Sequence, residues 1–453
     1  MNSIRVGIYT RERIRAVFHG EYKHGEEVIS GEKEICEAGW YIPISEDCSF
    51  SLMDVTIGID FHWERNETQT FKGSLEVMKA KNGELTAVNV LDIEDYLQSV
   101  ISSEMSATSH MELLKAHAVI SRSWALCKIQ RSLQGSAFAC QESEGKRICW
   151  YGSEPHEGFD VCADDHCQRY QGLRAKDHKN AIKAVQETKG EVLCQLGISV
   201  QTSGEASLLE LSRVKPEITS EASNLRSEEL GVKDYEICDA RFYKCCGGIT
   251  EEFETCWEDT HFDYLVKVED NDANRSLSPI NLTTEEGARE WILSSPEAFC
   301  NTSDKKILSQ VLNDYDQETI DFYRWKVVYS QEELTALVAR HAPQLGKIID
   351  LIPLKRGVSG RIYELKVVGE NGSIIIGKEL EIRKWLSNSH LYSSAFVVEK
   401  ENNTFTLYGA GWGHGVGLCQ IGAAVMAEKG YTYKEILQHY YPNTELLPLD
   451  HLS

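Results

Sequence analysis

The opening part of the chain alternates between apolar and polar positions with a period of two, which is the pattern of half-buried β-strands. Residues 4–9 and 53–59 follow this pattern most clearly. An Asn-Gly pair within residues 81–84 stands between two apolar runs and predicts a hairpin turn. We therefore expect residues 1–90 to form a β-rich N-terminal segment, built as an antiparallel sheet.

After Asp92 the apolar positions follow the period of a helix. The positions that define its apolar face are Ile93, Leu97, Val100 and Ile101. A second helix is predicted over residues 113–129, and it is apolar nearly all round, which indicates burial. Ser109 and Glu112 have the spacing of a capping box at its start.

Residue patterns that mark the ends of helices and the turns of hairpins are clearest in the last third of the chain. Ser330 and Glu333 have capping-box spacing before a helix that reaches about His341. Residues 361–376 read as a hairpin around a central Asn-Gly pair. Five glycines within residues 409–417 precede an Ala-rich helix that starts at Cys419-Gln420. A last helix is predicted between Thr432, which caps it, and Pro442, which stops it.

Two stretches have weaker patterns. Residues 201–235 are rich in Ser, Glu and Leu with little periodicity, and residues 271–345 are acidic and polar. Both are predicted to be insertions.

Composition narrows the possible functions. The chain has 453 residues, and 47 basic against 70 acidic residues give a net charge of −23. Such a surface repels phosphate backbones and anionic headgroups, so nucleic acid is not an expected partner. No apolar run reaches the roughly 18 to 20 residues of a transmembrane segment. The N-terminus lacks the pattern of a signal peptide, and the compartment stays open.

Fourteen cysteines favour reduced thiols with a metal site over a disulfide scaffold. Cys140 and Cys149 bracket a loop and could pair or stay free. Three cysteines are expected to be plain packing or surface residues: Cys36, Cys48 and Cys300.

One cluster has the composition of a zinc site. His156, Cys162, His166 and Cys167 follow the spacing H-x5-C-x3-H-C and offer four nitrogen and sulfur ligands. Four such ligands suffice for a closed, structural tetrahedral Zn²⁺ site. The alternative is a disulfide between Cys162 and Cys167, if the protein is exported.

Four blocks carry a specific resemblance. They are residues 95–125, which include Glu104; 156–172; 242–248; and 356–442, which include the glycine-rich loop. In this order and combination they resemble the SpoIID/LytB family, which comprises stage II sporulation protein D and amidase-enhancer relatives. The third block departs from the family pattern, because Cys245 and Cys246 stand where Ser or Thr is more usual.

The resemblance implies a peptidoglycan lytic transglycosylase. Such an enzyme would cleave MurNAc-GlcNAc bonds of glycan strands, expected to be stripped of stem peptides, and leave 1,6-anhydroMurNAc ends. The family's catalytic acid maps onto Glu104. Because the sugar's own 6-hydroxyl attacks, one Glu can act first as acid and then as base. Apolar surroundings would favour its protonated form. The resemblance also supports zinc in the second block.

Several polar side chains are candidates for substrate binding. Lys115 and Arg122 lie seven residues apart on one face of the buried helix and could contact the lactyl carboxylate or Glu104; the alternative is a structural ion pair. The other candidates are expected to line a cleft: Tyr243, Gly247, Gly248, His414 and Gln420. The alternatives here are a core tyrosine and a glycine-rich turn that packs Trp412.

Two other functions remain open. The first is a non-catalytic, glycan-binding enhancer of a cell-wall amidase, which would make that amidase a partner. The second is a zinc-dependent amidase or peptidase, which would need an open coordination position and a general base; the Cys-rich ligand set argues for a structural metal instead.

The predicted fold is α+β, with a β-rich N-terminal segment, central helices and a C-terminal β-plus-helix segment forming a cleft. The catalytic core is assigned to residues 91–200 and 236–270, interrupted by the insertion 201–235. After the second insertion, residues 271–345, the core resumes at 346–453. One discontinuous catalytic unit is expected.

Overall fold

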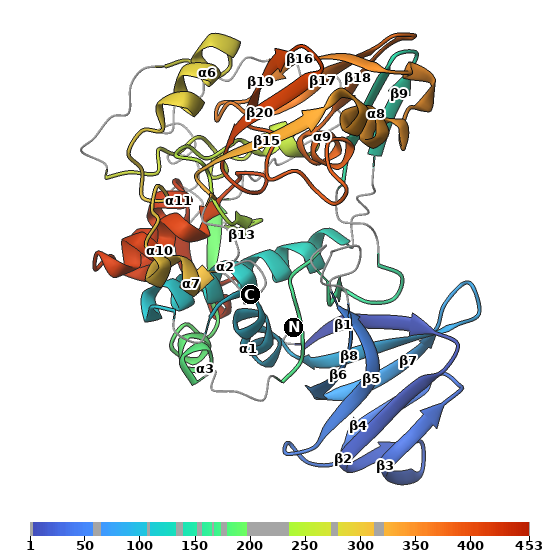
Figure 1. The fold of residues 1–453 in the computed structure, drawn as a ribbon. Coiled ribbons are helices and arrows are strands. Elements are labelled where there is room, and N and C mark those ends of the chain that lie inside the picture. Colours follow the sequence, from blue (N-terminus) through green and yellow to red (C-terminus); the bar gives the residue numbers. More distant parts are fainter. Residues whose placement is uncertain are drawn as a thin grey trace, which may run out of the picture.

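The structure is a computed structural model. It describes residues 3–57, 65–106, 109–132, 139–151, 156–164, 167–173, 179–196, 235–272, 280–311 and 321–452. The predicted insertion 201–235 lies outside this part of the chain except for Tyr235. The predicted α+β class is confirmed: Figure 1 shows the N-terminal sheet and a second β-rich unit at opposite ends, with helices between them.

The N-terminal segment forms eight strands of a nine-stranded sheet, in agreement with the period-two pattern, and the ninth strand comes from later in the chain. The nine strands are β1 (Ser3–Arg11), β2 (Ile14–His24), β3 (Glu27–Ile35), β4 (Gly39–Pro43), β5 (Ser49–Ile57), β6 (Arg65–Lys72), β7 (Ser74–Lys79), β8 (Leu85–Asp92) and β11 (Val161–Cys162). The order is β11-β1-β8-β7-β4-β2-β5-β6, with β3 beside β2. Gly83 takes φ +90° in the predicted turn between β7 and β8. The strands of this sheet pair antiparallel except for β11, which lies parallel to β1.

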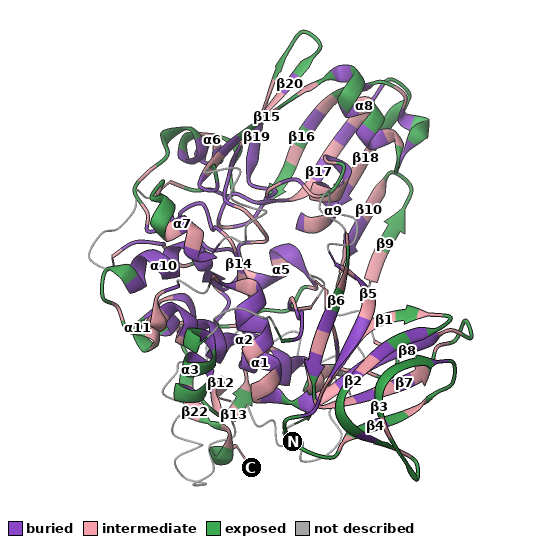
Figure 2. Cartoon of the chain, turned by 60° about the horizontal axis from the view of Figure 1, so that its bottom comes forward, coloured by how far each residue is buried: buried purple, intermediate pink, exposed green. Residues whose placement is uncertain are grey.

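Three helices follow: α1 (Ile93–Glu104), α2 (Met111–Ser132) and α3 (Lys179–Glu187). Helix α1 contacts β1 and β8 of the sheet, and α2 and α3 pack against α1 and each other. Asp92 caps α1 by accepting from the N–H of Glu94, and α2 is largely buried at the centre of the molecule (Figure 2). The predicted capping box at Ser109 is wrong. Its hydroxyl donates to the carbonyl of Gln310 instead, and His110 accepts from the N–H of Glu112.

The second β-rich unit has its own hydrophobic core, which extends from Trp325 to Leu407. It contains two sheets, β15-β20-β19 and β16-β17-β18-β10-β9. The strands are β9 (Ala139–Ser143), β10 (Lys146–Trp150), β15 (Arg324–Ser330), β16 (Ile348–Arg356), β17 (Ile362–Gly369), β18 (Gly372–Gly377), β19 (Phe396–Glu401) and β20 (Thr404–Ala410), with helices α8 (Gln331–Ala339), η2 (Pro343–Leu345) and α9 (Glu379–Trp385). The predicted capping box at Ser330 and the predicted 361–376 hairpin are confirmed. A disulfide between Cys140 and Cys149 joins β9 to β10.

This core joins parts of two predicted segments. β15 and α8 fall in the predicted insertion 271–345, yet they share the core of the predicted C-terminal segment 346–453. The domain boundaries otherwise stay predictions.

The remaining elements bring distant parts of the chain together. They are β12 (Glu191–Leu196), β13 (Tyr235–Ile237), β14 (Phe242–Tyr243), α5 (Phe253–Cys256), α6 (Glu285–Ser294), α7 (Lys305–Val311), β21 (Leu418–Cys419), α10 (Gln420–Glu428), α11 (Tyr433–Tyr440), β22 (Glu445–Pro448) and η3 (Leu449–His451). Two pairings matter most: β14 lies parallel to β21, and the C-terminal β22 returns to β12. The predicted starts of α10 and α11 are confirmed.

Across the described residues, no helix combines the length and apolar character needed to cross a membrane.

A buried ion pair joins α1 to α2. Arg122 is fully buried, and its guanidinium donates to both carboxylate oxygens of Glu94 at 2.9 and 2.6 Å. It also donates to the carbonyl of Glu191, at the start of β12. One guanidinium therefore joins α1, α2 and β12, and the carboxylate of Glu94 compensates its positive charge.

Glu94→Gln is expected to lower the free energy of unfolding by about 3 kcal/mol, because it leaves a buried guanidinium without its carboxylate. Urea denaturation measures this change. The control is Lys183→Gln, which removes the exposed pair between Lys183 and Glu187 and should cost less than about 1 kcal/mol. Equal effects of the two variants would contradict the assigned role of the buried pair.

Candidate active site around Glu104

Glu104 is the last residue of α1, where the helix ends and a loop begins. The side chain is half-buried, and Met105, which follows it, is buried. The backbone N–H of Arg169 donates to Oε1 of Glu104 over 3.1 Å. A helix C-terminus carries partial negative charge, so this position opposes a second negative charge. The fold thus fixes the carboxyl of Glu104 at the end of α1 through a backbone donor from another segment.

The segment 167–173 that supplies this N–H is itself tied to α1. The hydroxyl of Tyr96 donates to the side-chain carbonyl of Gln168 at 3.1 Å, and Ser99 donates to the carbonyl of Gly172 at 2.8 Å. These bonds come from the same helix that ends at Glu104. Contacts from α1 to Gln168 and to Gly172, on either side of Arg169 in the chain, therefore hold the N–H of Arg169 near the carboxyl of Glu104.

The loop after Glu104 is held by α7, from a region predicted to be an insertion. The carbonyl of Gln310 accepts from the N–H of Ser106 and from the hydroxyl of Ser109. The side chain of Gln310 accepts from the N–H of His110 and donates to Glu428 in α10. Gln310 is 2% exposed. Sequence reasoning missed this residue, because nothing in its neighbourhood signals a partner 200 positions away.

The predicted metal group is assembled next to this segment. His156, Cys162 and Cys167 each place one ligand atom within 4.8 Å of the others. His156 Nε2 lies 3.2 Å from the sulfur of Cys167, which also accepts from the ammonium of Lys128. Neither Cys162 nor Cys167 is disulfide-bonded, so the disulfide alternative does not hold in this structure. The fourth predicted ligand, His166, lies outside the described residues.

The two basic candidates on α2 are engaged by acids. Lys115 pairs with Glu187 at 2.7 Å and with Glu112 at 3.3 Å. Arg122 is bidentate with Glu94, as described above. These contacts match the structural alternative for both residues, and a role in binding substrate stays a prediction.

The glycine-rich loop packs around a buried arginine. The guanidinium of Arg361 donates to the carbonyls of Gly413 and Cys246 and to the hydroxyl of Ser359. Gly415 has φ +88°, and a Cβ there would stand 2.4 Å from that guanidinium. The loop therefore needs glycine at this position to admit Arg361.

His414 uses both ring nitrogens within the protein. Nδ1 accepts from the N–H of Val416, so Nε2 carries the proton and donates to the carbonyl of Phe242. Burial, reinforced by the guanidinium groups of Arg241 and Arg361, lowers the pKa of His414 well below its usual value, and the ring is neutral. A glycan contact through His414 stays a prediction.

Tyr243 lies edge-on against His414, with ring centroids 5.2 Å apart. Its hydroxyl is buried and has no hydrogen-bond partner among the described residues. An orphaned buried hydroxyl costs free energy, so it marks a position where a ligand group would be favoured. The adjacent Gly247 and Gly248 pack tightly: a Cβ would meet the backbone N of Gly411 at 2.9 Å or the ring of Trp291 at 2.8 Å.

Gln420, the first residue of α10, faces α2. Its amide nitrogen donates to Nε2 of His117, and Ser121 contacts the other ring nitrogen of that histidine. Burial, with a smaller effect from Lys244, lowers the pKa of His117 to about 3, so the acceptor is neutral imidazole. Gln420 thereby joins the last family-like block to the first one.

The predicted site residues thus fall into four groups. Glu104 adjoins the segment that follows the metal group, Tyr243 contacts His414, and Gln420 contacts α2. Lys115 and Arg122 serve ion pairs between helices. Arg361, which lies in the fourth family-like block, was not singled out as a site residue from the sequence, although it bonds to Gly413 of the glycine-rich loop and to Cys246.

Comparison with known proteins agrees with this arrangement. A family model described as stage II sporulation protein matches residues 81–194, which include Glu104 and the metal group. A model of a domain of unknown function (DUF8618) matches residues 251–417.

Individual relatives point the same way. Stage II sporulation protein D of Bacillus subtilis is 22% identical over 364 residues, which are 80% of this chain and 77% of that protein. An uncharacterized protein of Brachyspira hyodysenteriae is 22% identical, over 82% of this chain and 71% of its own length. The amidase enhancer of Bacillus subtilis is 39% identical over 66 residues, 15% of this chain and 9% of that protein. The stage II sporulation protein model and these relatives support the resemblance to the SpoIID/LytB family that the sequence blocks indicated.

Proposed function

We propose that this protein is a peptidoglycan lytic transglycosylase in which Glu104 is the single acid and base. The coarser conclusion, a role related to the bacterial cell wall, is supported by the family and by the names of the relatives. The observation that carries the finer proposal is the placement of Glu104: a half-buried carboxyl at a helix C-terminus, fixed by the Arg169 N–H.

The reaction would proceed without water. Glu104 starts protonated and gives its proton to the oxygen that links MurNAc C1 to the next GlcNAc, and the C1–O bond breaks. The 6-hydroxyl oxygen of the same MurNAc bonds to C1, and its proton passes to Glu104. The carboxyl returns to its starting state, and the products together have the mass of the substrate. A hydrolase would instead need a second carboxylate to activate water.

The fold's part in this reaction is positioning. The Arg169 N–H orients the carboxyl, and the contacts of segment 167–173 with α1 keep that N–H in place. The orphaned hydroxyl of Tyr243 is a candidate for a hydrogen bond to the sugar. We propose that Glu104 and Tyr243 line opposite parts of one glycan cleft.

Zinc is proposed as a structural component. His156, Cys162 and Cys167 would hold it, with His166 as the fourth ligand. The donor set fits, because two thiolates and imidazole are typical ligands of structural Zn²⁺. When bound, the ion would supply rigidity to a segment with little regular structure of its own, and Arg169 lies two residues beyond Cys167.

A second candidate function has one observation in its favour. The local match to the amidase enhancer reaches 39% identity over 66 residues. On that account the protein would bind glycan strands and stimulate a partner amidase without breaking glycosidic bonds. The two functions differ in whether new anhydro ends form.

Glu104→Gln is expected to reduce glycan cleavage by at least about 10²- to 10⁴-fold, because it removes the proton donor while keeping the shape of the side chain. The substrate is stem-peptide-free glycan strands, and mass spectrometry counts 1,6-anhydro ends. The control is Glu26→Gln, an exposed acid in the β2–β3 turn, which should cleave like wild type. Thermal melting should show that both variants are folded.

Two outcomes would overturn the proposal. Wild-type products heavier by one water would identify a hydrolase. Strands that stay intact while bound to wild type, together with stimulation of an added amidase, would favour the enhancer function.

The double variant Cys162→Ser/Cys167→Ser is expected to lose one equivalent of zinc per chain, since two ligands of the site are removed. Cleavage should fall on the order of 10²-fold, because a displaced Arg169 no longer fixes the acid. Elemental analysis and the anhydro-end assay measure the two effects. Cys36→Ser, an exposed free cysteine, should change neither. Zinc loss without loss of cleavage would contradict the positioning role.

A further inference from the structure

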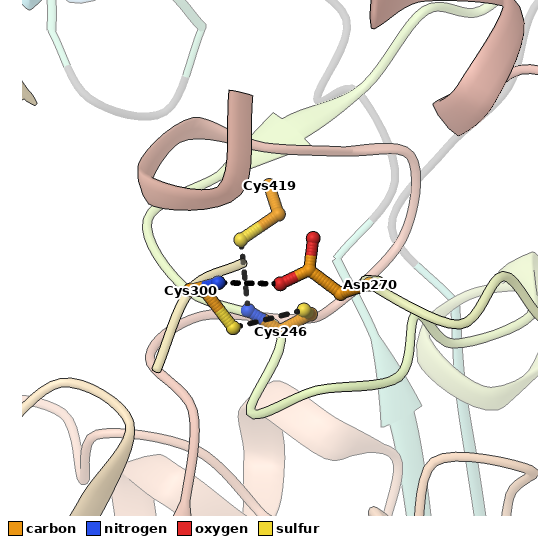
Figure 3. A group of neighbouring side chains, drawn as sticks. All are labelled: Cys246, Asp270, Cys300 and Cys419. Atoms are coloured by element: carbon orange, nitrogen blue, oxygen red, sulfur yellow. Dashed lines mark hydrogen bonds between the residues drawn. The ribbon is translucent and has the colours of Figure 1, made fainter. Parts of the chain in front are cut away.

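A second group of cysteines lies far from the predicted metal group in the sequence. Figure 3 shows Cys246, Asp270, Cys300 and Cys419 converging on one point. One ligand atom from each lies within 4.8 Å of all the others. All four residues are buried, with at most 3% of the surface of any one exposed. Cys300, expected from the sequence to be a plain packing residue, is part of this group.

We propose that these four residues form a second, closed Zn²⁺ site with three thiolate ligands and one carboxylate ligand. The spacing fits one ion: with Zn–S bonds of about 2.3 Å, sulfurs on a tetrahedral zinc stand roughly 3.8 Å apart. The sulfurs of Cys246 and Cys300 are 3.4 Å apart. An iron–sulfur cluster would bind its thiolates through several different metal atoms and separate them further.

The backbone around the sulfurs is arranged for thiolates. Cys419 is the N-cap of α10 and accepts from the N–H groups of Gly422 and Cys246. Cys246 accepts from the N–H of Gly248. A helix N-terminus and N–H donors both stabilise negative charge on sulfur. These donors offset the excess negative charge that three thiolates and a carboxylate would leave on a zinc ion.

Asp270 gives an independent indication. It is fully buried, and among the described residues its carboxylate is bonded by a hydroxyl and a backbone N–H, with no Lys or Arg paired to it. Its carboxylate accepts from the hydroxyl of Tyr440 at 2.5 Å and from the N–H of Cys300 at 2.8 Å. Each oxygen has a second lone pair, so both bonds can persist when a cation binds. A buried carboxylate without a cation is costly, and a metal ion would compensate it.

The donor set also selects among metals. A carboxylate together with thiolates in a small tetrahedral site suits Zn²⁺, whereas Cu⁺ favours sulfur ligands without a hard oxygen. Because the site is closed and has no exposed position, the ion would be structural. It would join four segments: the loop after β14, the chain near Asp270, the turn before α7, and the start of α10.

This joining has a consequence for the loop after Glu104. Cys300 lies five residues before α7, and α7 carries Gln310, which holds Ser106, Ser109 and His110. A metal at Cys300 would therefore fix the start of the helix that supports this loop. The inference itself concerns metal binding and does not require that the protein cleaves glycan.

The test is zinc content and coordination of the full chain. Wild type is expected to bind two zinc ions, and Cys300→Ser or Cys419→Ser should each bind one. The control is Cys194→Ser, a buried cysteine outside both groups, which should bind two. Asp270→Asn, which keeps the shape of the side chain, should weaken zinc binding about 10- to 100-fold in competition with a chelator.

X-ray absorption of zinc-loaded Cys162→Ser/Cys167→Ser protein isolates the second site and does not depend on variants within it. Three sulfurs at about 2.3 Å and one oxygen are expected. The proposal is overturned if that protein holds no zinc, if iron or copper occupies the site, or if mass spectrometry of alkylated wild type finds Cys246 and Cys300 joined as a disulfide. Unchanged zinc content in Cys300→Ser and Cys419→Ser would also overturn it.

Discussion

The hydrogen bond from the Arg169 N–H to Glu104 depends on a segment that has almost no regular structure in its described residues, 156–164 and 167–173. Between residues 156 and 173, β11 is two residues long. Scattered backbone bonds hold parts of this segment, such as the bond from the N–H of Tyr170 to the carbonyl of Ala163. The three clustered ligands and the bonds from α1 add side-chain contacts to them. In the proposed function, this is why a structural metal accompanies a single catalytic acid.

The second constraint is that the site is assembled from segments far apart in the chain. Glu104 comes from the first family-like block, yet the loop after it is held by Gln310, and Gln310 is bonded to α10. The buried cysteine group follows the same principle, because it draws one ligand from each of four segments. Short polar and thiol contacts thereby join parts of the chain that are far apart in the sequence.

Local patterns predicted local structure well. The Asn-Gly turn at 81–84, the capping boxes of α8 and α11, and the start of α10 depend on residues within four positions of one another, and all are confirmed. The capping box at Ser109 was wrong because a distant carbonyl, that of Gln310, accepts the serine hydroxyl. The same limit applies to the site. The residues of the His156–Cys167 group were visible as a spacing, while Cys246, Asp270, Cys300 and Cys419 follow one another at intervals of 24, 30 and 119 positions and gave no local signal. Arg122 illustrates a different limit, since its type predicted a buried partner but could not specify Glu94.

The most direct measurement is the crystal structure of Glu104→Gln with a stem-peptide-free glycan bound. Our account predicts that the oxygen of a MurNAc–GlcNAc bond lies within hydrogen-bond distance, about 2.6–3.2 Å, of the residue 104 side chain. It also predicts that no other carboxylate faces C1 of that sugar from the opposite side. A glycan bound away from residue 104, or a second carboxylate placed to activate water, would contradict the claim that Glu104 alone serves as acid and base.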